Sequence, residues 1–537
     1  MLGVAAADHD LDVVAELFEL FKTPWEPAAP GRHYDVVLSA GIDVQGIDAR
    51  VVLAYGAASH GSDTAHCGTR EAQSGTELSW GETRLPLFGR AGLFETGSSP
   101  SLLSLDGQPA DHRACVGGRV VWRVGYDLFS EIRHLLTTGQ PEAYAPTPTL
   151  EWHIELLRQL LLKSGASFVE IPPRPAGFDF TCCLTHDLDF FGIRRQGLGP
   201  SLAGFVARAS VGTLVDWARG RRPASEVARN WGALLSLPMV LLRLAPDFWK
   251  PFDDYEQVEH SLPSTYFVIP FKQKPGVGPD GAAPGSRAVC YQASEIRDDI
   301  RRAVARGREV AVHGIDSWCD ADAGRTEMGE LVSVTGKSRT GVRMHWLYFD
   351  SESPARLEEA GFDYDSTWGY NAAVGFRPGT SQVFRLPGTR SLMELPLTIM
   401  DSALFYRGRM NLTREEARRR CSAIVAYARR FGGSVVINWH DRSLAPERLW
   451  GRSYRELLNE VRQGDRAWFA TAQDAVDWFR WRRSIAFRPE SGNRVGITAV
   501  SRPAGLPAAS VAVWRPTQDH AVSTISFEGG RELALQL

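Results

Sequence analysis

The sequence predicts an α/β protein built around a barrel of about seven strand–helix units, with a further region on each side. Three observations support this fold class. The 537 residues exceed what one ordinary core holds, so about two to four domains are expected. Short apolar strands alternate with helical segments from residue 178 to about 484, and the composition changes on both sides of that stretch. We therefore predict domains at 1–172, 173–484 and 485–537.

The N-terminal region, 1–172, mixes strand-like and helical patterns. Its strand-like runs include YDVVLSAG and RVVLAYG, and it closes on PTLEWHIELLRQLLLKSG. In this last stretch Ile154, Leu157 and Leu161 recur at helical spacing. The run IPPRPAG then interrupts the chain, because proline lacks a backbone donor and restricts the residue before it. An α/β domain that ends near residue 172 is expected.

The central region alternates between two patterns. Its strands are FTCCL, STYFVIP, EVAVHG, GVRMHW, LMELPLT, GSVVINWH and AWFA, and its helices include ASEIRDDIRRAVARG, SPARLEEAG and REEARRRCSAIVAYARRFGG. Glycine closes helices of this kind because it adopts a left-handed conformation without strain. Repeated strand and helix predict a parallel sheet, and about seven repeats favour closure into a barrel.

The C-terminal region, from residue 485, changes character again. It contains strand-like pieces with no good helix between them, namely IAFRPESG, GITAV, ASVAVW and STISFEG. Several short strands separated by turn residues predict a small β appendage.

The composition limits the classes of partner and compartment. Lys and Arg total 60 against 63 Asp and Glu, a formal net charge of −3, so we expect no long-range attraction for nucleic acid. No basic leader with an apolar core opens the sequence, no stretch approaches the about 18 apolar residues of a transmembrane helix, and the seven cysteines show no disulfide framework. These features predict a cytoplasmic protein with reduced thiols.

The most apolar segment is WGALLSLPMVLLRL, residues 231–244. It is short, and Pro238 interrupts it. A buried or covering helix is therefore favoured over an interfacial helix, with association at a membrane surface as the alternative.

Polar side chains gather at the ends of four predicted strands. In an α/β barrel the reacting groups sit at the carboxyl ends of the strands. A single histidine there is more often structural, but a histidine at each of four strand ends favours a common site. The residues are His186, Asp187 and Asp189 after FTCCL, His313 and Asp316 after EVAV, Arg343 and His345 in GVRMH, and His440 with Asp441 after SVVIN.

This set of side chains suits a metal-assisted hydrolysis. Two aspartates with two or three histidines are ligands for zinc, and cobalt, nickel or iron would also fit. Such an ion polarises a carbonyl and acidifies a water, a nearby carboxylate takes the proton, and a second imidazole protonates the leaving group. The sequence therefore indicates hydrolysis of an amide or an ester.

The motifs THDLD, VHGIDS, GVRMHWLYFD, ELPLTIMD and VINWHD resemble, in order and spacing, those of the polysaccharide deacetylase superfamily (NodB homology, carbohydrate esterase family four). They look most like its bacterial subgroup with THDxD in place of TFDDG. The resemblance covers roughly 178–484, and the N-terminal region looks like the accessory domain that often precedes such catalytic domains. It implies a distorted (β/α)7 barrel. It also implies metal-dependent removal of an N-acetyl, less often an O-acetyl, group from an amino-sugar-containing saccharide or glycoconjugate.

The resemblance also implies roles for individual residues. Asp187 looks like the catalytic base, Asp189 like a metal ligand and His440 like the general acid. The remaining assignments are His313 as a metal ligand, Arg343 as the residue that orients the base, and Asp365 or Asp401 as the partner of His440.

One position departs from the family pattern. The second motif usually carries another histidine four residues after the first, and here that residue is Ser317. We expect His345 to supply the missing ligand, with Asp316 and His186 as alternatives; His186 would otherwise be a hydrogen-bond partner behind the ligands. A barrel in which none of them reaches the ion would be a degenerate carbohydrate-binding or assembly protein.

Aromatic residues accompany these motifs. Aromatic faces stack on the apolar faces of sugar rings, which favours a carbohydrate groove over ordinary core packing. The predicted substrate-binding residues are Trp318, Trp346, Trp368, Tyr370 and Trp439. A glycosidase is disfavoured, because Asp187 and Asp189 are too close in sequence to flank a glycosidic bond.

Overall fold

The computed structural model describes residues 1–58, 67–71, 76–94, 101–197, 199–490, 494–516 and 522–536. The chain divides into two compact units, each assembled from separate segments. Unit 1 comprises Met1–Gly177, Phe376–Pro387 and Asp477–Leu537, and unit 2 comprises Phe178–Gly375 and Gly388–Val476. The residues predicted as a C-terminal appendage thus belong to the same unit as the N-terminal region. Pairing between strands so distant in sequence leaves no local signal.

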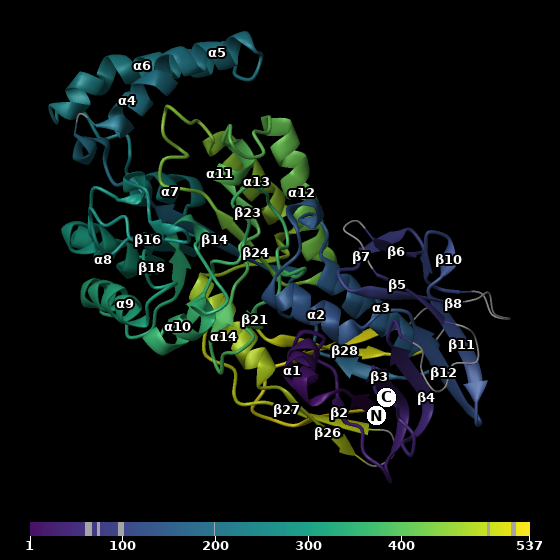
Figure 1. The fold of residues 1–537 in the computed structure, drawn as a ribbon. Coiled ribbons are helices and arrows are strands. Elements are labelled where there is room, and N and C mark those ends of the chain that lie inside the picture. The colour runs from purple at the N-terminus through teal and green to yellow at the C-terminus, as the bar shows by residue number, and fades with distance from the viewer. Residues whose placement is uncertain are drawn as a thin grey trace. The chain divides into compact units, whose positions relative to one another are not determined.

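Unit 2 is a mixed α/β unit built on a curled parallel sheet (Figure 1). Its hydrogen-bonded order is β22-β20-β19-β18-β15-β14-β24-β23, and β25 also pairs with β14. The strands are β14 (Phe180–Leu188), β15 (Ser264–Val268), β18 (Glu309–Gly314), β19 (Val342–Met344), β20 (Tyr364–Asp365), β22 (Met393–Glu394), β23 (Ile399–Met400), β24 (Ser434–Asn438) and β25 (Ala467–Phe469).

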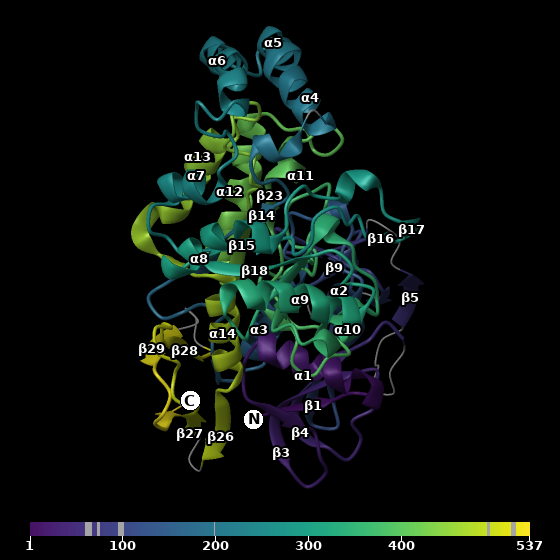
Figure 2. The ribbon, with the colours of Figure 1, turned by 90° about the vertical axis from the view of Figure 1, so that its left-hand side faces the viewer.

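The central strands are buried on both faces. Every residue of β14, β15 and β24 is buried, which accounts for their nearly continuous apolar runs. Figure 2 shows β14, β15 and β18 side by side. The helices of unit 2 outside the sheet are α7 (Pro251–Glu259), α8 (Arg297–Ala305), α9 (Ala321–Thr335), α10 (Ser353–Ala360), α11 (Asp401–Phe405), α12 (Arg414–Phe431) and α13 (Gly451–Arg462), and α14 (Ala472–Arg483) begins in unit 2 and continues into unit 1.

Local sequence signals set the ends of these helices. Thr413 and Glu416 form a capping box at the start of α12, in which each side chain bonds the other's backbone amide. Asp320 caps α9, whose other end is closed by Gly336 in the left-handed conformation. Gly361 closes α10 in the same way. The predicted helices 353–361 and 414–433 therefore lie where their end signals place them.

The alternation of strand and helix becomes irregular after β19. The strands β20, β22 and β23 are two residues long, and residues 376–387, which come between β20 and β22 in the sequence, belong to unit 1. The run LMELPLT, predicted as one strand, yields β22 and the approach to β23 with Pro396 between them. Proline cannot donate to a ladder, so a continuous strand is interrupted there.

Helices α4 (Pro200–Ala207), α5 (Thr213–Ala218) and α6 (Ala224–Leu241) form an extension of unit 2 that we call the helical arm, residues 200–245. Leu202, Phe205, Leu237 and Val240 on its inner face join a core cluster that includes Trp249. The segment 231–244 was expected to be buried or covering, and it is buried on this one face only. Within the described ranges, no helix has the length and apolarity to cross a membrane.

Unit 1 contains a mainly parallel sheet in the order β11-β12-β4-β3-β1-β2. Its strands are β1 (Leu2–Ala5), β2 (Trp25–Pro27), β3 (His33–Ala40), β4 (Asp48–Tyr55), β11 (Asp111–Val116) and β12 (Arg119–Val124), and its helices are α1 (Leu11–Leu20), α2 (Leu128–Thr137) and α3 (Thr149–Lys163). A second sheet joins distant parts of the chain, since β13 (Phe168–Glu170) pairs with β28 (Ala509–Trp514), which pairs with β29 (Val522–Phe527). A third sheet contains β26 (Ala486–Glu490), β27 (Arg494–Thr498) and β30 (Leu533–Gln536).

Candidate active site

The carboxyl ends of β14, β18, β19 and β24 meet at one cavity of unit 2, with a volume of about 260 Å³. All four strands are parallel and belong to one sheet, so their ends lie on the same edge. The sequence-predicted residues that line the cavity are Asp187, Asp189, His313, His345, Trp346 and His440.

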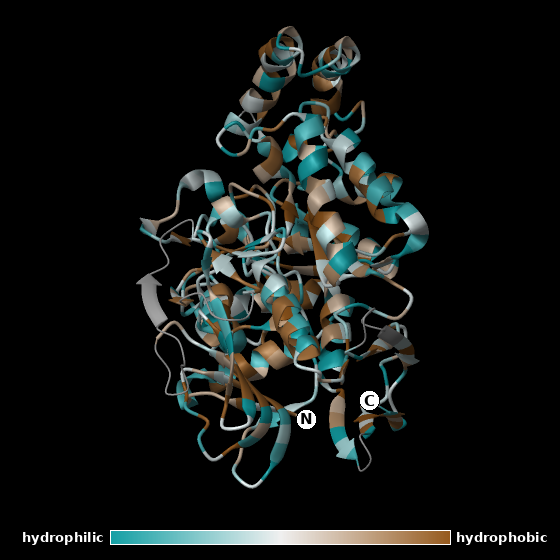
Figure 3. Ribbon diagram, turned by 90° about the vertical axis from the view of Figure 1, so that its right-hand side faces the viewer, coloured by the Kyte–Doolittle hydropathy of each residue, from teal (hydrophilic) through white to brown (hydrophobic). Residues whose placement is uncertain are grey.

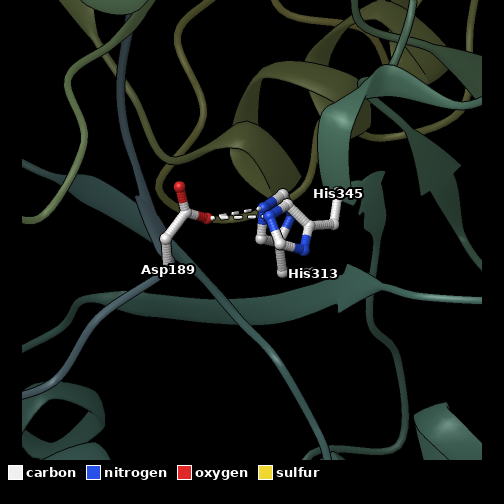
Figure 4. A group of neighbouring side chains, drawn as sticks. All are labelled: Asp189, His313 and His345. Atoms are coloured by element: carbon white, nitrogen blue, oxygen red, sulfur yellow. Dashed lines mark ion pairs between the residues drawn. The ribbon is translucent and has the colours of Figure 1, made fainter. Parts of the chain in front are cut away.

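Asp189, His313 and His345 form a compact group within this cavity (Figure 4). One ligand atom from each lies within 4.8 Å of the others. His313 Nε2 is 3.4 Å and His345 Nε2 is 3.5 Å from Asp189 Oδ1. One carboxylate oxygen thus faces two imidazole nitrogens, a donor set suited to a divalent transition metal.

The surroundings of the three side chains fit a bound ion. Asp189 Oδ1 is buried and makes no hydrogen bond within the described structure, which is costly for a carboxylate unless a cation compensates it. His313 Nδ1 donates to the carbonyl of Arg343 at 2.9 Å, which leaves Nε2 with its lone pair toward Asp189. Burial lowers the pKa of His345 to about 3, so this imidazole is neutral and free to donate its lone pair.

Asp187 lies beside this group and is held from two sides. Arg343 Nη1 donates to its Oδ1 at 2.9 Å, and Asn438 Nδ2 donates to its Oδ2 at 2.7 Å. Burial opposes ionisation, but Arg343 and the neighbouring imidazoles outweigh it and hold the pKa of Asp187 below its usual range. Arg343 is itself fully buried and also bonds Thr185 and Ser366. The carboxylate is therefore ionised and fixed in orientation.

His440 approaches from the other side of Asp189. Its Nε2 is 3.9 Å from Asp189 Oδ2, the oxygen that does not face the other two histidines. Its Nδ1 donates to Asp401 Oδ1 at 2.5 Å, and its backbone amide donates to Asp401 Oδ2 at 2.8 Å. Burial favours the neutral ring, but Asp401, Asp189 and Asp187 together raise the pKa of His440 to about 10. His440 is therefore protonated at neutral pH, with its side chain 17% exposed.

Asp401, and not Asp365, is the partner of His440. Asp365 lies at the end of β20 and accepts a hydrogen bond from the backbone of Thr367, with Glu394 next to it. Burial raises the pKa of Glu394, and the adjacent Asp365 raises it further. The pair belongs to the core beside Arg343.

His186 does not reach the candidate metal site, so this alternative ligand is wrong. Its Nδ1 donates to the carbonyl of Trp439 at 2.9 Å, and its Nε2 is 2.7 Å from Glu259 Oε1. The ring is fully buried and stacks on Tyr255, with 3.7 Å between the centroids. Successive side chains of a strand point to opposite faces, so His186 points away from the face that carries Asp187.

Asp316 is likewise not a ligand. Its Oδ1 accepts from the amide of Val277 at 2.8 Å, and its Oδ2 pairs with Lys274 at 3.1 Å. Ser317, at the position where the family has a histidine, donates to buried Glu327 at 2.5 Å. The loop after β18 is thus anchored on α9, and His345 remains the third member of the group.

Most of the predicted sugar-binding aromatic residues belong to the core. Trp318, Trp368, Tyr370 and Trp439 are buried, and none of the four is among the described residues that line the cavity. Trp439 instead stacks on Tyr454, with centroids 5.2 Å apart. Trp346 does line the cavity and is 37% exposed, enough to offer part of its ring face. Position beside a strand end does not decide whether an aromatic ring points outward.

Several residues of the site were not predicted from the sequence. Asn438 is the second hydrogen-bond donor to Asp187, and its place two residues before His440 at a strand end is a signal that could have identified it. Tyr406 and Arg409 also line the cavity, and the Arg409 guanidinium lies 5.3 Å from the Tyr406 ring centroid. They follow a five-residue helix outside the strand pattern, where the sequence carries no comparable signal.

Comparison with solved structures returns polysaccharide deacetylases and an allantoinase. A protein from Mycobacterium smegmatis assigned as a polysaccharide deacetylase is 22% identical, with 60% of this chain and 100% of that chain covered and a TM-score of 0.35. PuuE allantoinase is 15% identical, with 57% and 92% covered and a TM-score of 0.36. A probable polysaccharide deacetylase from Pseudomonas aeruginosa PAO1 is 15% identical, with 58% and 94% covered and a TM-score of 0.36.

No protein-family model matches the chain, and no curated protein matches it.

Proposed function

We propose that unit 2 is a metal-dependent hydrolase that removes an acetyl group from an amino-sugar-containing saccharide or glycoconjugate. One observation carries the proposal. Asp189 faces His313 and His345 with one oxygen and the protonated His440 with the other, and the ionised Asp187 lies alongside. The two proposed histidine ligands, the proposed base and the proposed acid thus all lie next to the carboxylate of Asp189.

The donor set for the ion would be Asp189, His313 and His345. A divalent cation bound there would supply Lewis acidity to a carbonyl oxygen and lower the pKa of a water molecule, with zinc as the first choice and cobalt, nickel or iron as alternatives. Three protein ligands leave coordination positions for such groups, as catalytic sites require.

The protein's own residues would move the protons. Asp187 takes a proton from the attacking water, and Arg343 and Asn438 keep its carboxylate pointed at that water. His440 gives its proton to the nitrogen that leaves as the bond to the acetyl carbon breaks, and Asp401 stabilises the imidazolium until then. The acetamide group and water become acetic acid and an amine, and a proton passed from Asp187 back to His440 restores the starting state.

The substrate is proposed from the cavity. A volume of about 260 Å³ with the partly exposed ring of Trp346 on its wall suits one sugar residue stacked on an aromatic face. An N-acetyl group is preferred over an O-acetyl group, because an amine leaves far more readily when an acid such as His440 protonates it.

The test combines metal analysis with acetate release from N-acetylglucosamine oligomers. Asp187→Asn preserves the shape and the metal group, so we expect normal metal content and a rate lowered by about 10²–10⁴-fold. Asp322→Asn, at a carboxylate 85% exposed on α9, is the matched control and should behave as wild type. A wild-type protein without metal that releases no acetate from N- or O-acetylated sugars would contradict the proposal and favour a degenerate carbohydrate-binding barrel.

A further inference from the structure

The outer face of the helical arm is unusually apolar for a surface. Fifteen large hydrophobic side chains are exposed in the described part of the chain, and ten of them lie on this one arm. Leu235, Leu242 and Leu244 are 79%, 69% and 72% exposed, so they contribute nearly their whole side chains. Contiguous apolar patches mark interaction sites. The other seven are Val206, Val211, Leu214, Trp217, Trp231, Met239 and Leu241.

Four of these residues share one side of α6. Trp231, Leu235 and Met239 recur every four positions, and Leu242 follows three positions later at the C-cap. Ala233 and Leu237, two positions after Trp231 and Leu235, face the opposite side and pack with Val240 in the arm's core cluster. Figure 3 shows the apolar residues in brown on the helices at the top, which Figure 1 labels α4 to α6. The arm is thus apolar on two faces, and the core cluster covers only the inner one.

The charge of the arm differs in sign from that of the whole chain. Residues 200–245 carry six arginines and two acidic residues, whereas the chain has a net charge of −3. Both acids, Asp216 and Glu226, pair with Arg222, at 3.3 and 4.0 Å. Four exposed arginines therefore give this surface its net positive charge, namely Arg219, Arg221, Arg229 and Arg243.

We propose that the outer face of the helical arm docks on an anionic lipid bilayer, with its apolar side chains among the acyl chains and its arginines on the headgroups. Amphipathic helices with Trp and Leu on one side and basic residues around them lie in the interface in this way. Trp217 and Trp231 are 51% and 43% exposed, and tryptophan is enriched at the headgroup level. No helix in the described ranges spans a membrane, so the contact is peripheral.

A second copy of the chain is a poorer occupant of this surface. A two-fold interface places the same patch on both partners, so the four exposed arginines of one copy would face those of the other. Like charges opposed across an interface weaken association, whereas phosphate headgroups complement them. The charge therefore favours lipid over self-association.

The test is sedimentation of the full chain with vesicles. Wild type should bind vesicles of phosphatidylglycerol and phosphatidylcholine, and should bind at least about tenfold less to phosphatidylcholine alone, because the arginines lose their partners. The variant Leu235→Asp with Leu242→Asp should bind at least about tenfold less, and so should Arg229→Glu with Arg243→Glu. Both pairs are exposed, so the fold should persist, and acetate release from a small soluble substrate should be unchanged.

The matched control is Val500→Asp, a residue of unit 1 that is 65% exposed, which should bind vesicles as wild type does. Failure of wild type to bind any vesicle, or equal binding by Leu235→Asp with Leu242→Asp, would overturn the proposal. A wild-type dimer in analytical ultracentrifugation that the same leucine variant converts to monomer, without vesicle binding by either, would also overturn it and identify a second copy as the occupant. Vesicle binding and oligomeric state are both measured independently of the proposed hydrolysis.

Discussion

The two sides of Asp189 hold histidines in opposite protonation states. His345 faces Asp189 Oδ1 at 3.5 Å, and burial lowers its pKa to about 3. His440 faces Oδ2 of the same carboxylate at 3.9 Å, and the carboxylates around it raise its pKa to about 10. His345 is buried and the side chain of His440 is 17% exposed, and both lie near one carboxylate, yet the first ring is neutral and the second is protonated.

The difference in pKa between His345 and His440 arises from a second carboxylate, that of Asp401, and not from Asp189. His440 has Asp401 bonded to Nδ1, whereas Nδ1 of His345 is buried without a hydrogen-bond partner in the described structure. Desolvation penalises a charged imidazole ring. Asp189, 3.5 Å from His345, does not outweigh this penalty, whereas Asp401, which is hydrogen-bonded to His440, does. The same type of side chain therefore has a lowered pKa at one position of the site and a raised pKa at the other.

The largest effect on the rate is expected from replacing His440, the proposed acid. His440→Asn keeps a polar group of similar reach but supplies no proton to the leaving nitrogen, so the rate of deacetylation should fall by about 10²–10⁴-fold. Metal content should stay normal, because His440 is not part of the ligand group. Acetate release and metal analysis on the same preparation measure the two effects. Loss of metal in this variant would show that the two sides are not separate.

Replacement of the proposed ligand His345 should weaken metal binding and leave the proposed acid in place. His345→Ala removes one of three donors, so metal affinity should fall by more than the about 10–100-fold that changes behind the ligands cost. Excess metal should then restore part of the activity, which it cannot do for His440→Asn. Competition with a chelator measures the affinity. An unchanged affinity would mean that His345 is not a ligand.

A smaller effect is expected in the pH dependence of kcat when Asp401 is replaced. Asp401 raises the pKa of His440, so wild type keeps the acid protonated up to about pH 10. In Asp401→Asn, burial dominates and the pKa falls, so the alkaline limb of kcat moves to lower pH by at least about one unit. The variant should therefore lose activity more at pH 8.5 than at pH 6. A limb that stays in place would contradict the role of Asp401.

Much of this site could be predicted because it follows the strand pattern. Parallel strands bring their carboxyl ends to one edge, so the side chains after FTCCL, EVAV and SVVIN had to converge. Asp187, Asp189, His313, His345 and His440 all line the cavity for this reason. The roles given to them remain proposals, but their meeting place follows from the parallel order.

Residues whose orientation depends on tertiary packing could not be predicted. His186 is adjacent to Asp187 in sequence, yet its ring is held by Glu259 from α7, a contact 73 residues away. The choice between Asp365 and Asp401 depended on which loop passes under His440. The C-terminal strands were assigned to an appendage because nothing local reveals that β28 pairs with β13 in unit 1.

The position of β14 between β15 and β24 has a consequence for synthesis of the chain. Thr185 donates to the carbonyl of Ile437, 252 residues further on, so the strand that carries Asp187 lacks one neighbour until most of the polypeptide exists. At about 5–20 residues per second on the ribosome, that neighbour follows on the order of 10–50 s later. Contacts so distant in sequence also slow folding itself. A chain cut before β24 would expose one edge of β14, a strand in which every residue is buried in the complete protein. A chaperone that holds unfolded chains would have its greatest effect between the synthesis of β14 and that of β24.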